Sequence, residues 1–256
     1  EEELQSIVQR LHTLDLPFLV IGHGSNLLVD DFPGVFISLK KMESIFTAEQ
    51  RRVTASSELP MATFIRKVAT LGWGGCESLA GIPGSLGGAI YMNAGAHYQS
   101  VFDYLVSLKF LDHSGVIRVL PRDQIDFSYR RGFRDGIILS AQFSFLKKES
   151  TEILLGKIRD KMQWRREKQP RGPNGGCMFK NLANHFAGAL VEQVGLKGTS
   201  IGGAKIAEQH GNFIVNNDGN ATVSDIKRLL RLMRQRVFER YGIFLEREIL
   251  FASDRC

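Results

Sequence analysis

The apolar residues of the chain follow helical spacing at the N-terminus and then form short extended runs. A first helix is predicted by apolar residues three or four positions apart, at Leu4, Ile7, Val8, Leu11 and Leu14. Residues 18–21 form an apolar run that predicts a buried strand and leads directly into the glycine loop 22–26. Residues 27–29 and 35–39 predict further short strands. A helix, a strand and a glycine loop in this order suggest an α/β unit whose ligand loop follows a strand.

The middle of the chain predicts a helix, a group of strands and a second helix. The first helix covers residues 60–71, with Pro60 in its first turn. Three strands are then predicted, over residues 105–111, 116–120 and 137–145. The strands end in the charged residues 147–150, where we place a domain boundary. Residues 152–168 predict the second helix, and the glycines and prolines of 169–176 end it in a hinge or an active-site loop.

Two further helices are predicted near the C-terminus. Phe186, Leu190, Val191 and Val194 line one face of the first, which Gly195 ends. The second begins with Thr222 and Asp225 as a capping box and ends at Gly242. Its apolar stripe consists of Ile226, Leu229, Leu230, Met233, Val237 and Tyr241. Residues 201–204 and 213–216 predict short strands between these helices, and residues 245–250 predict another after them.

Glycine is concentrated in residues 72–95, which hold eight of the protein's 26 glycines among mostly apolar neighbours. Such glycines mark places where the backbone turns through positive φ or approaches another group closely. The segment therefore forms either buried turns or, as we favour, a loop whose N–H groups bind an anion such as a pyrophosphate. The loop 22–26 lacks the third glycine of the dinucleotide fingerprint, because Leu27 stands there. Both loops could still hold one diphosphate.

Composition and charge narrow the class of protein. The 256 residues are 43% hydrophobic and 23% charged, which is ordinary for a globular protein, and no apolar run approaches the ~20 residues of a membrane span. Glu1, Glu2 and Glu3 have the wrong sign for a secretory signal. The net charge of +6 is densest at residues 165–168 and 228–240, which form either solvated helix faces or attract a polyanionic small molecule. Without interleaved aromatics or a known motif, we expect no nucleic-acid partner.

Cysteine and histidine usage excludes several kinds of site. Cys76, Cys177 and Cys256 give an odd count without metal-ligand spacing, which argues against a disulfide framework and fits a reducing compartment, by default the cytoplasm. None of the six histidines has metal-ligand spacing, so no metal site is expected.

Three segments carry candidate chemistry. Residues 128–131 place arginines in a turn, where they are either surface charges or partners of a carboxylate or phosphate. Cys177 follows two glycines and stands near Lys180 and Asn181, so it is either a buried structural cysteine or a nucleophile or acid. Glu248 lies on the predicted strand 245–250, either as a paired surface carboxylate or as a functional group.

Taken together, these segments resemble the UDP-N-acetylenolpyruvoylglucosamine reductase family. Single motifs are weak evidence, but here they keep the family's order over nearly the whole chain. The matching segments are residues 22–29, 79–89, 92–96, 128–130, 176–181, 196–204, 210–216 and 245–249. Residues 1–148 would then form an FAD-binding domain of α+β class with a PCMH-like flavin fold, in subdomains of about 1–45 and 46–148. Residues 149–256 would form an α+β substrate-binding domain.

The resemblance also has departures. The sequence begins at what looks like the family's first helix, so the segment with a Thr-x-x-x-Gly-Gly pattern, which supplies the first strand, is missing from it. His23 stands where the family usually has glycine, and Gly132 stands where a serine commonly follows the Tyr-Arg motif. An insertion like the tyrosine-bearing substrate loop is absent, which favours the shorter branch of the family.

The family's chemistry assigns roles to the candidates. NADPH reduces FAD, which then reduces the enolpyruvyl ether of UDP-N-acetylglucosamine to UDP-N-acetylmuramate, for peptidoglycan synthesis and hence for cell-wall biogenesis, cell shape and cell division. Arg130 and Glu248 would stabilise the negative charge that forms, and Cys177 would donate the proton. The UDP-sugar would contact Tyr129, Asn181, Lys197 and His210. FAD would be held by Gly22, His23, Gly24, Ser25, Asn26, Leu27, Gly81, Ile82, Pro83, Gly84, Ser85, Gly87, Gly88, Ala89 and Asn93.

Two other functions stay open from the sequence. One is an FAD-linked oxidase with the same flavin fold, and the other is a non-catalytic nucleotide-sugar binder. The motifs around Arg130, Cys177 and Glu248 favour the reductase. We expect an enzyme that works as a monomer in the cytoplasm, without membrane insertion.

Overall fold

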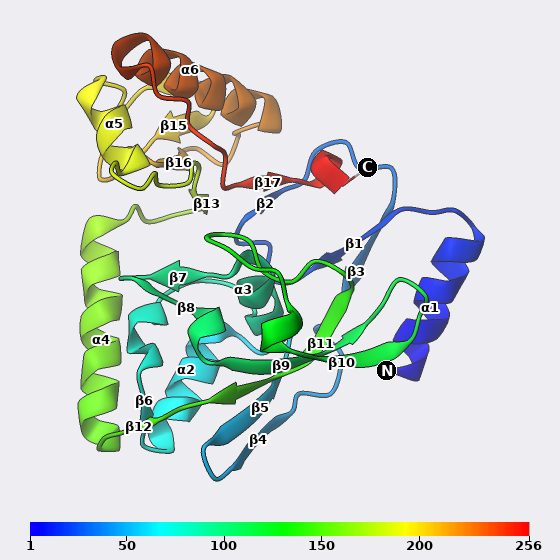
Figure 1. The fold of residues 1–256 in the computed structure, drawn as a ribbon. Helices are drawn as coiled ribbons and strands as arrows, with labels where there is room; N and C mark the ends of the chain where they lie inside the picture. Colours follow the sequence, from blue (N-terminus) through cyan, green and yellow to red (C-terminus); the bar gives the residue numbers. More distant parts are fainter. Residues whose placement is uncertain (256) are drawn as a thin grey trace. The chain divides into compact units, whose positions relative to one another are not determined.

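The computed structural model describes residues 1–255 of the chain, which fold into two compact units (Figure 1). The first unit comprises residues 1–23 and 33–163, and the second comprises residues 24–32 and the chain from Trp164 onward. The predicted boundary at residue 148 precedes helix α4 (Thr151–Lys168), whereas the two units divide within that helix. Residues 24–32, assigned above to the first domain, fold with the second unit. Cys256 lies outside the described residues.

A five-stranded antiparallel sheet forms the centre of the first unit, in the order β10-β9-β11-β5-β4. Its strands are β4 (Phe46–Glu49), β5 (Arg52–Ser56), β9 (Leu105–Leu111), β10 (Ile117–Pro121) and β11 (Ile137–Ser144). The three strands predicted between residues 105 and 145 are therefore confirmed. Helix α2 (Met61–Thr70) buries Phe64 and Val68 in the same core as Phe143 of β11, and the rings of Phe64 and Phe143 lie 4.8 Å apart.

A second core in the first unit surrounds the N-terminal helix. Helix α1 (Glu2–Thr13) buries Leu4, Val8 and Leu11, as its spacing predicted. These side chains share their core with Ile37 of β3 and Leu139 of β11. Strands β1 (Phe18–Ile21) and β3 (Val35–Ser38) pair in parallel, and β6 (Trp73–Gly74) pairs with β12 (Lys147–Lys148).

The glycine-rich segment is more regular than the sequence indicated. It contains the 3₁₀-helix η1 (Cys76–Leu79), helix α3 (Leu86–Met92) and a hairpin of β7 (Gly95–Ala96) and β8 (Gln99–Ser100). Ser85 caps α3 by accepting a hydrogen bond from the Gly88 amide at 3.2 Å, and Asn93 ends it in the left-handed conformation. Two further 3₁₀-helices follow, η2 (Val101–Asp103) and η3 (Arg122–Gln124).

In the second unit, helices α5 (Ala187–Gln193) and α6 (Val223–Tyr241) pack on an antiparallel sheet of order β13-β16-β15-β14 (Figure 1). The strands are β13 (Asn174–Cys177), β14 (Ser200–Ile201), β15 (Ala204–Ile206) and β16 (Phe213–Asn216). The capping box of α6 and its end at Gly242 are confirmed. The predicted single strand 201–204 is wrong, because Gly202 and Gly203 form a turn between β14 and β15.

The same unit pairs two segments that are far apart in the sequence. Strand β2 (Leu27–Leu28) lies parallel to β17 (Leu250–Phe251), which leads into the 3₁₀-helix η4 (Ala252–Arg255). The predicted strand 245–250 is therefore mostly irregular, and only its last residue belongs to a strand. Among the described residues, no helix is both long enough and apolar enough to cross a membrane.

Candidate active site

Gly22 and the loop 81–85 meet in the first unit. A Cβ atom at Gly22 would overlap the Oγ atom of Ser85, so the two segments touch in a way that only glycine permits. The loop turns through positive φ at Gly81 (79°) and Gly84 (118°). It is fixed to the start of α2, because the Met61 amide donates to the Gly84 carbonyl at 3.0 Å. The structure thus brings Gly22, the first residue of the loop 22–26, against the loop 81–85.

Backbone amides line the bend of this loop. The N–H groups of Gly81, Gly84 and Ser85 make no hydrogen bond to any residue that the structure describes. Gly87 and Gly88, in contrast, donate within the unit, to the Ser57 carbonyl at 2.7 Å and to Ser85 Oγ at 3.2 Å. The loop therefore offers three N–H groups with positive partial charge, which suits an anion such as a diphosphate. The amides of the following glycines serve packing and capping instead.

The turn that carries Tyr129 and Arg130 is docked on α3. Asn93 donates from Nδ2 to the Ser128 carbonyl at 2.9 Å, and the Gly132 amide donates to the Tyr91 carbonyl at 3.0 Å. A Cβ atom at residue 132 would overlap the carbonyl oxygen of Ile90. This close approach explains why glycine replaces the serine that the resemblance led us to expect.

Arg130 has a left-handed backbone within this turn, with φ 59°. That conformation is rare for a residue other than glycine, asparagine or aspartate and is found most often at functional sites. The guanidinium lies 4.8 Å from the ring centroid of the half-exposed Tyr129. The turn thus presents Arg130 from a position fixed by the glycine-rich segment.

Cys177 and Glu248 come from neighbouring segments of the second unit. The Glu248 amide donates to the carbonyl of Met178, the residue after Cys177, at 2.9 Å. Lys180 continues the pairing through its amide, which donates to the Glu246 carbonyl at 2.8 Å. Both Cys177 and Glu248 are partly exposed. The Glu248 backbone therefore pairs with Met178, the residue next to Cys177, which is the predicted proton donor.

Asn212 supports this register and was missed by the sequence reasoning. Its buried side chain accepts from the Phe179 amide at 2.9 Å and donates to the Phe179 carbonyl at 2.8 Å. The signal was present in the His-Gly-Asn segment 210–212, which the resemblance had matched only as a whole. A buried amide that satisfies both backbone groups of one residue is a strong local restraint.

The first glycine loop is divided between the units. Gly22 and His23 belong to the first, whereas Gly24, Ser25, Asn26 and Leu27 belong to the second. In the second unit, Asn26 donates from Nδ2 to the Glu248 carbonyl at 3.2 Å, and the Leu250 amide donates to the Asn26 carbonyl at 3.2 Å. The side chain of Asn26 thus holds the segment with Glu248, a contact that the sequence did not predict.

The predicted substrate residues Lys197 and His210 both lie within the electrostatic influence of Glu192. Lys197 lies 3.5 Å from the Glu192 carboxylate, which also accepts from the Gly211 amide at 3.1 Å. His210 accepts from the Asn212 amide through Nδ1 at 3.2 Å, which leaves Nε2 as its donor. Burial lowers the pKa of His210, and the Lys197 charge lowers it further against the opposing effect of Glu192. His210 is therefore a neutral hydrogen-bond donor at neutral pH.

Asn181 and the two cysteines Cys76 and Cys177 are the remaining candidate groups with polar or reactive side chains. Asn181 accepts from the Ala187 amide at 3.0 Å, which leaves its NH₂ group as a donor. Cys76 and Cys177 are free thiols. Burial, together with the neighbouring Glu77, raises the pKa of Cys76 to about 12, so this thiol stays protonated. Within residues 1–255, no cluster of histidine, cysteine and acidic residues could hold a metal ion.

Gly22 and the loop 81–85 together form what we call the glycine cradle. Residues 1–120, which contain it, match the family described as "FAD binding domain". The fold and the cradle thus define the class of the chain as a flavoprotein with an FAD-binding domain. Residues 168–252 match the family described as "UDP-N-acetylenolpyruvoylglucosamine reductase, C-terminal domain". The chain belongs to the UDP-N-acetylenolpyruvoylglucosamine reductase family, as its motifs led us to expect.

Relatives that cover nearly the whole chain support this membership. The UDP-N-acetylenolpyruvoylglucosamine reductase of Bacillus velezensis is 37% identical over 255 residues, 97% of this chain and 84% of the relative. That of Synechococcus sp. is 37% identical over 253 residues, 96% of this chain and 81% of the relative. The crystal structure of the enzyme from Thermus caldophilus matches with a TM-score of 0.81 at 31% identity, covering 98% of this chain and 88% of that one. The predicted family and fold class are confirmed.

Proposed function

We propose that the chain reduces the enolpyruvyl ether of UDP-N-acetylglucosamine enolpyruvate to UDP-N-acetylmuramate, a step in peptidoglycan precursor synthesis, with NADPH as the reductant and FAD as the cofactor. The observation that carries the proposal is the register that sets Cys177 beside the Glu248 segment, because reduction of this alkene needs both a proton donor and stabilisation of a carboxylate. The printed names of the relatives support the same reaction.

The first unit's cradle fits the pyrophosphate of FAD. The amides of Gly81, Gly84 and Ser85 would donate to its oxygens, and Gly22 allows the close approach of the two segments. FAD held by these residues would supply the hydride-transfer chemistry that links NADPH to the enolpyruvyl double bond. The buried Oδ1 atom of Asn93 has no hydrogen-bond partner within the described residues and is a further candidate for a cofactor contact.

Arg130 and Glu248 would stabilise the charge that builds up on the substrate. Hydride addition to the terminal alkene carbon moves the π electrons toward the carboxylate, which becomes enolate-like. The guanidinium of Arg130 can donate two parallel hydrogen bonds to such a group. Glu248, in its protonated form, would donate one more.

Cys177 would complete the reduction. Its Sγ–H proton moves to the carbon that bears the carboxylate, the electron pair of the enolate forms the new C–H bond, and the thiolate is left. The thiolate regains a proton from water before the next turnover. An ordinary thiol has a pKa of about 8.5, so a cysteine is a far better donor than a hydroxyl group.

The UDP-sugar would be held in the second unit. Lys197 carries the positive charge that a diphosphate requires, while His210 and Asn181 offer neutral N–H donors. The half-exposed Tyr129 would add a contact from the Arg130 turn. We further propose that the enzyme works in the cytoplasm, which the free thiols Cys76 and Cys177 support, and that it is a monomer, which light scattering after size-exclusion chromatography tests.

Anaerobic spectroscopy of the purified protein tests the proposed function. The protein should show flavin absorbance in the visible region, lose it on addition of NADPH, and recover it on addition of the enolpyruvyl UDP-sugar. UDP-N-acetylglucosamine, which lacks the alkene, should not restore it. A colourless protein would favour a nucleotide-sugar binder, and rapid recovery with oxygen alone would favour an oxidase.

A further inference from the structure

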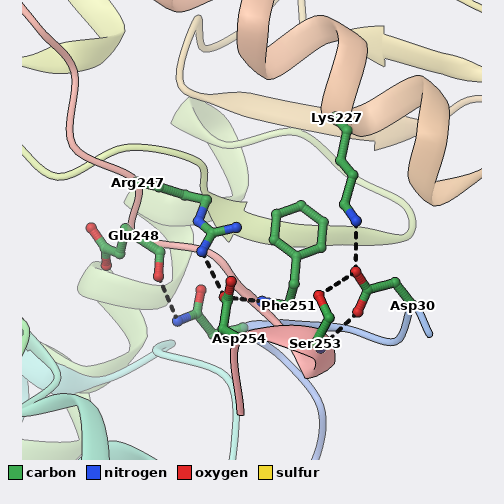
Figure 2. A network of polar contacts seen from close by, with 8 residues as sticks. Asp30, Lys227, Arg247, Glu248, Phe251, Ser253 and Asp254 are labelled. Atoms are coloured by element: carbon green, nitrogen blue, oxygen red, sulfur yellow. Dashed lines mark hydrogen bonds and ion pairs between the residues drawn. The ribbon is translucent and has the colours of Figure 1, made fainter. Parts of the chain in front are cut away.

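Asp30 is a nearly buried carboxylate that joins three segments of the second unit. Its side chain is 8% exposed. One oxygen, Oδ2, accepts from Lys227 Nζ of α6 at 2.6 Å and from Ser253 Oγ at 2.6 Å (Figure 2). The other oxygen, Oδ1, accepts from the Ser253 amide at 2.8 Å. Asp30 therefore ties the segment 24–32 to α6 and to the C-terminal 3₁₀-helix η4.

These contacts close one end of a very short strand pair. The ladder between β2 and β17 contains only the pairs Leu27–Leu250 and Leu28–Phe251. At the other end, Asn26 binds the backbone of Glu248 and Leu250. Because so short a ladder supplies few backbone hydrogen bonds, the side chains of Asn26 and Asp30 must fix its register.

The residues around Glu248 are held by a second set of contacts. The ring of Phe251 lies between two cations, with the Arg247 guanidinium 4.5 Å and Lys227 Nζ 4.8 Å from its centroid (Figure 2). Asp254 Oδ2 accepts from Arg247 Nη2 at 2.6 Å and from the Phe251 amide at 2.8 Å. Lys227 thus belongs both to this stack and to the Asp30 pair.

Glu248 lies next to Arg247 in this restrained segment. In Figure 2 the guanidinium of Arg247 is directed into the network, and the carboxyl group of Glu248 is directed away from it. Anything that fixes Arg247 through Asp254 and Phe251 therefore also fixes the direction of Glu248.

We propose that Asp30 is a positioning residue for Glu248, acting through Lys227 and Ser253 on the segment 247–254. The proposal rests on the role assigned to Glu248 under the proposed function. The side chain of Asp30 binds Lys227 and Ser253, so we expect its effect to reach Glu248 through the segment 247–254.

The electrostatics of Asp30 agree with a permanent anion. Burial alone would raise the pKa of Asp30, but the hydrogen bonds from Lys227 and Ser253 outweigh it and hold the pKa well below its usual range. Asp30→Asn would remove this charge with little change of shape and leave Lys227 without its partner. Without this charge, the hydrogen bonds that hold Ser253 should weaken first, and the segment 247–254, which includes Glu248, should become less restrained.

Hydrogen exchange and rapid kinetics on the FAD-loaded protein test the proposal. In Asp30→Asn, the amides of residues 247–254 should exchange faster than in the wild type, including the Glu248 amide. Flavin reduction by NADPH should keep its rate, while reoxidation by the enolpyruvyl UDP-sugar should slow about tenfold, since small misplacements of reacting groups have effects of this size. In a Glu248→Gln background, Asp30→Asn should add no further loss. Lys227→Met should reproduce the effects, and Lys227→Arg should restore most of the rate.

A matched control is Glu239→Gln, which removes a carboxylate paired 3.5 Å from Arg236 on the same helix. It should change neither readout. Three results would overturn the proposal. The first is an equal loss of rate in both half-reactions of Asp30→Asn, and the second is a rate loss that multiplies with that of Glu248→Gln. The third is unchanged amide hydrogen exchange in residues 247–254. If the wild-type flavin is not reoxidised by the sugar, the proposed function fails, and hydrogen exchange still decides whether Asp30 holds the segment.

Discussion

At the level of single residues, Arg130 combines a strained backbone conformation with a predicted catalytic role. A left-handed backbone costs a residue with a Cβ about 1–2 kcal/mol relative to the right-handed region. The neighbouring Arg131 has no positive φ, pairs with Asp126 at 3.2 Å and is exposed. Two arginines side by side thus differ in conformation, and only the strained one carries a predicted catalytic role.

We therefore expect opposite consequences of the same substitution at these two positions. Arg130→Gly relieves the left-handed strain, whereas Arg131→Gly has no such strain to relieve. The Arg130→Gly variant should therefore have a free energy of unfolding about 1 kcal/mol higher than that of the Arg131→Gly variant. Arg130→Gly should slow substrate-driven flavin reoxidation by about 10²–10³-fold, as loss of a charge-stabilising donor does, whereas Arg131→Gly should stay near the wild type. Urea unfolding and stopped-flow reoxidation provide the two measurements. Equal stability of the two variants, or equal activity, would contradict this account.

His210 gives a prediction for stability against pH. Burial, with Lys197, holds its pKa in the folded protein below the usual value of about 6.5. The unfolded chain then binds the proton first as the pH falls, so the stability that neutral His210 contributes is present above pH ~6.5 and is lost below it. Between about pH 7.5 and pH 5.5, the wild type should lose more unfolding free energy than His210→Gln. A pH dependence of His210→Gln identical to that of the wild type would refute the assignment.

At the scale of elements, the contact between Gly22 and Ser85 joins the two glycine loops. Gly22→Ala would force the loops apart because its Cβ atom overlaps Ser85 Oγ, and the purified protein should hold less FAD than the wild type. Ser85→Ala alone removes a helix cap, which costs about 1 kcal/mol.

The double variant makes the test specific. With Oγ removed, the Cβ atom at residue 22 would meet Ser85 Cβ at 3.4 Å, an ordinary contact. Gly22→Ala combined with Ser85→Ala should therefore bind more FAD than Gly22→Ala alone. Failure of this rescue, measured by the flavin-to-protein absorbance ratio, would show that the two loops do not meet as described.

The sequence predicted the elements whose burial follows a clear period. The stripes of α1 and α6 and the runs of β9 and β11 needed no tertiary information. Helix α3 escaped prediction because glycines 87 and 88 lower its intrinsic helicity, and it exists through the Ser85 cap and the burial of Leu86 and Ile90.

The site was predicted less completely than the fold. Family motifs supplied Arg130, Cys177 and Glu248 as candidates, but they gave no register between the Cys177 and Glu248 segments. That register depends on backbone pairing at Met178 and on the buried Asn212, contacts between residues distant in sequence. Asn26 illustrates the same limit, since a loop motif cannot reveal that its side chain binds the Glu248 backbone.

At the scale of the whole molecule, the chain crosses between the units more than once, and residues 24–32 fold with the second unit. The basic run 228–240 is also not uniform. Arg234 donates to the Leu245 carbonyl at 2.9 Å and lies 5.0 Å from the ring centroid of Phe244, whereas Arg228 and Arg231 are exposed. Arg234 is therefore held in structural contacts, whereas Arg228 and Arg231 are exposed to solvent.

A positive protein that binds an anionic sugar nucleotide should show salt-dependent binding. We expect the KM for the enolpyruvyl UDP-sugar to rise as ionic strength increases from about 0.01 to about 0.1 M, because the screening length falls from ~30 to ~10 Å. Lys197→Gln should flatten this dependence, while Lys40→Gln, an equal loss of charge at an exposed site of the first unit, should preserve it. A salt-independent KM, or equal slopes in the two variants, would argue against Lys197 as the diphosphate contact.

If Cys177 supplies the proton that completes reduction of the enolpyruvyl group, its loss should affect only the second half-reaction. Stopped-flow absorbance of the two half-reactions in Cys177→Ala measures this. Reduction of the flavin by NADPH should proceed at the wild-type rate, and reoxidation by the enolpyruvyl UDP-sugar should fall by about 10²–10⁴-fold, with partial recovery in Cys177→Ser. Reoxidation of Cys177→Ala at the wild-type rate would contradict the claim.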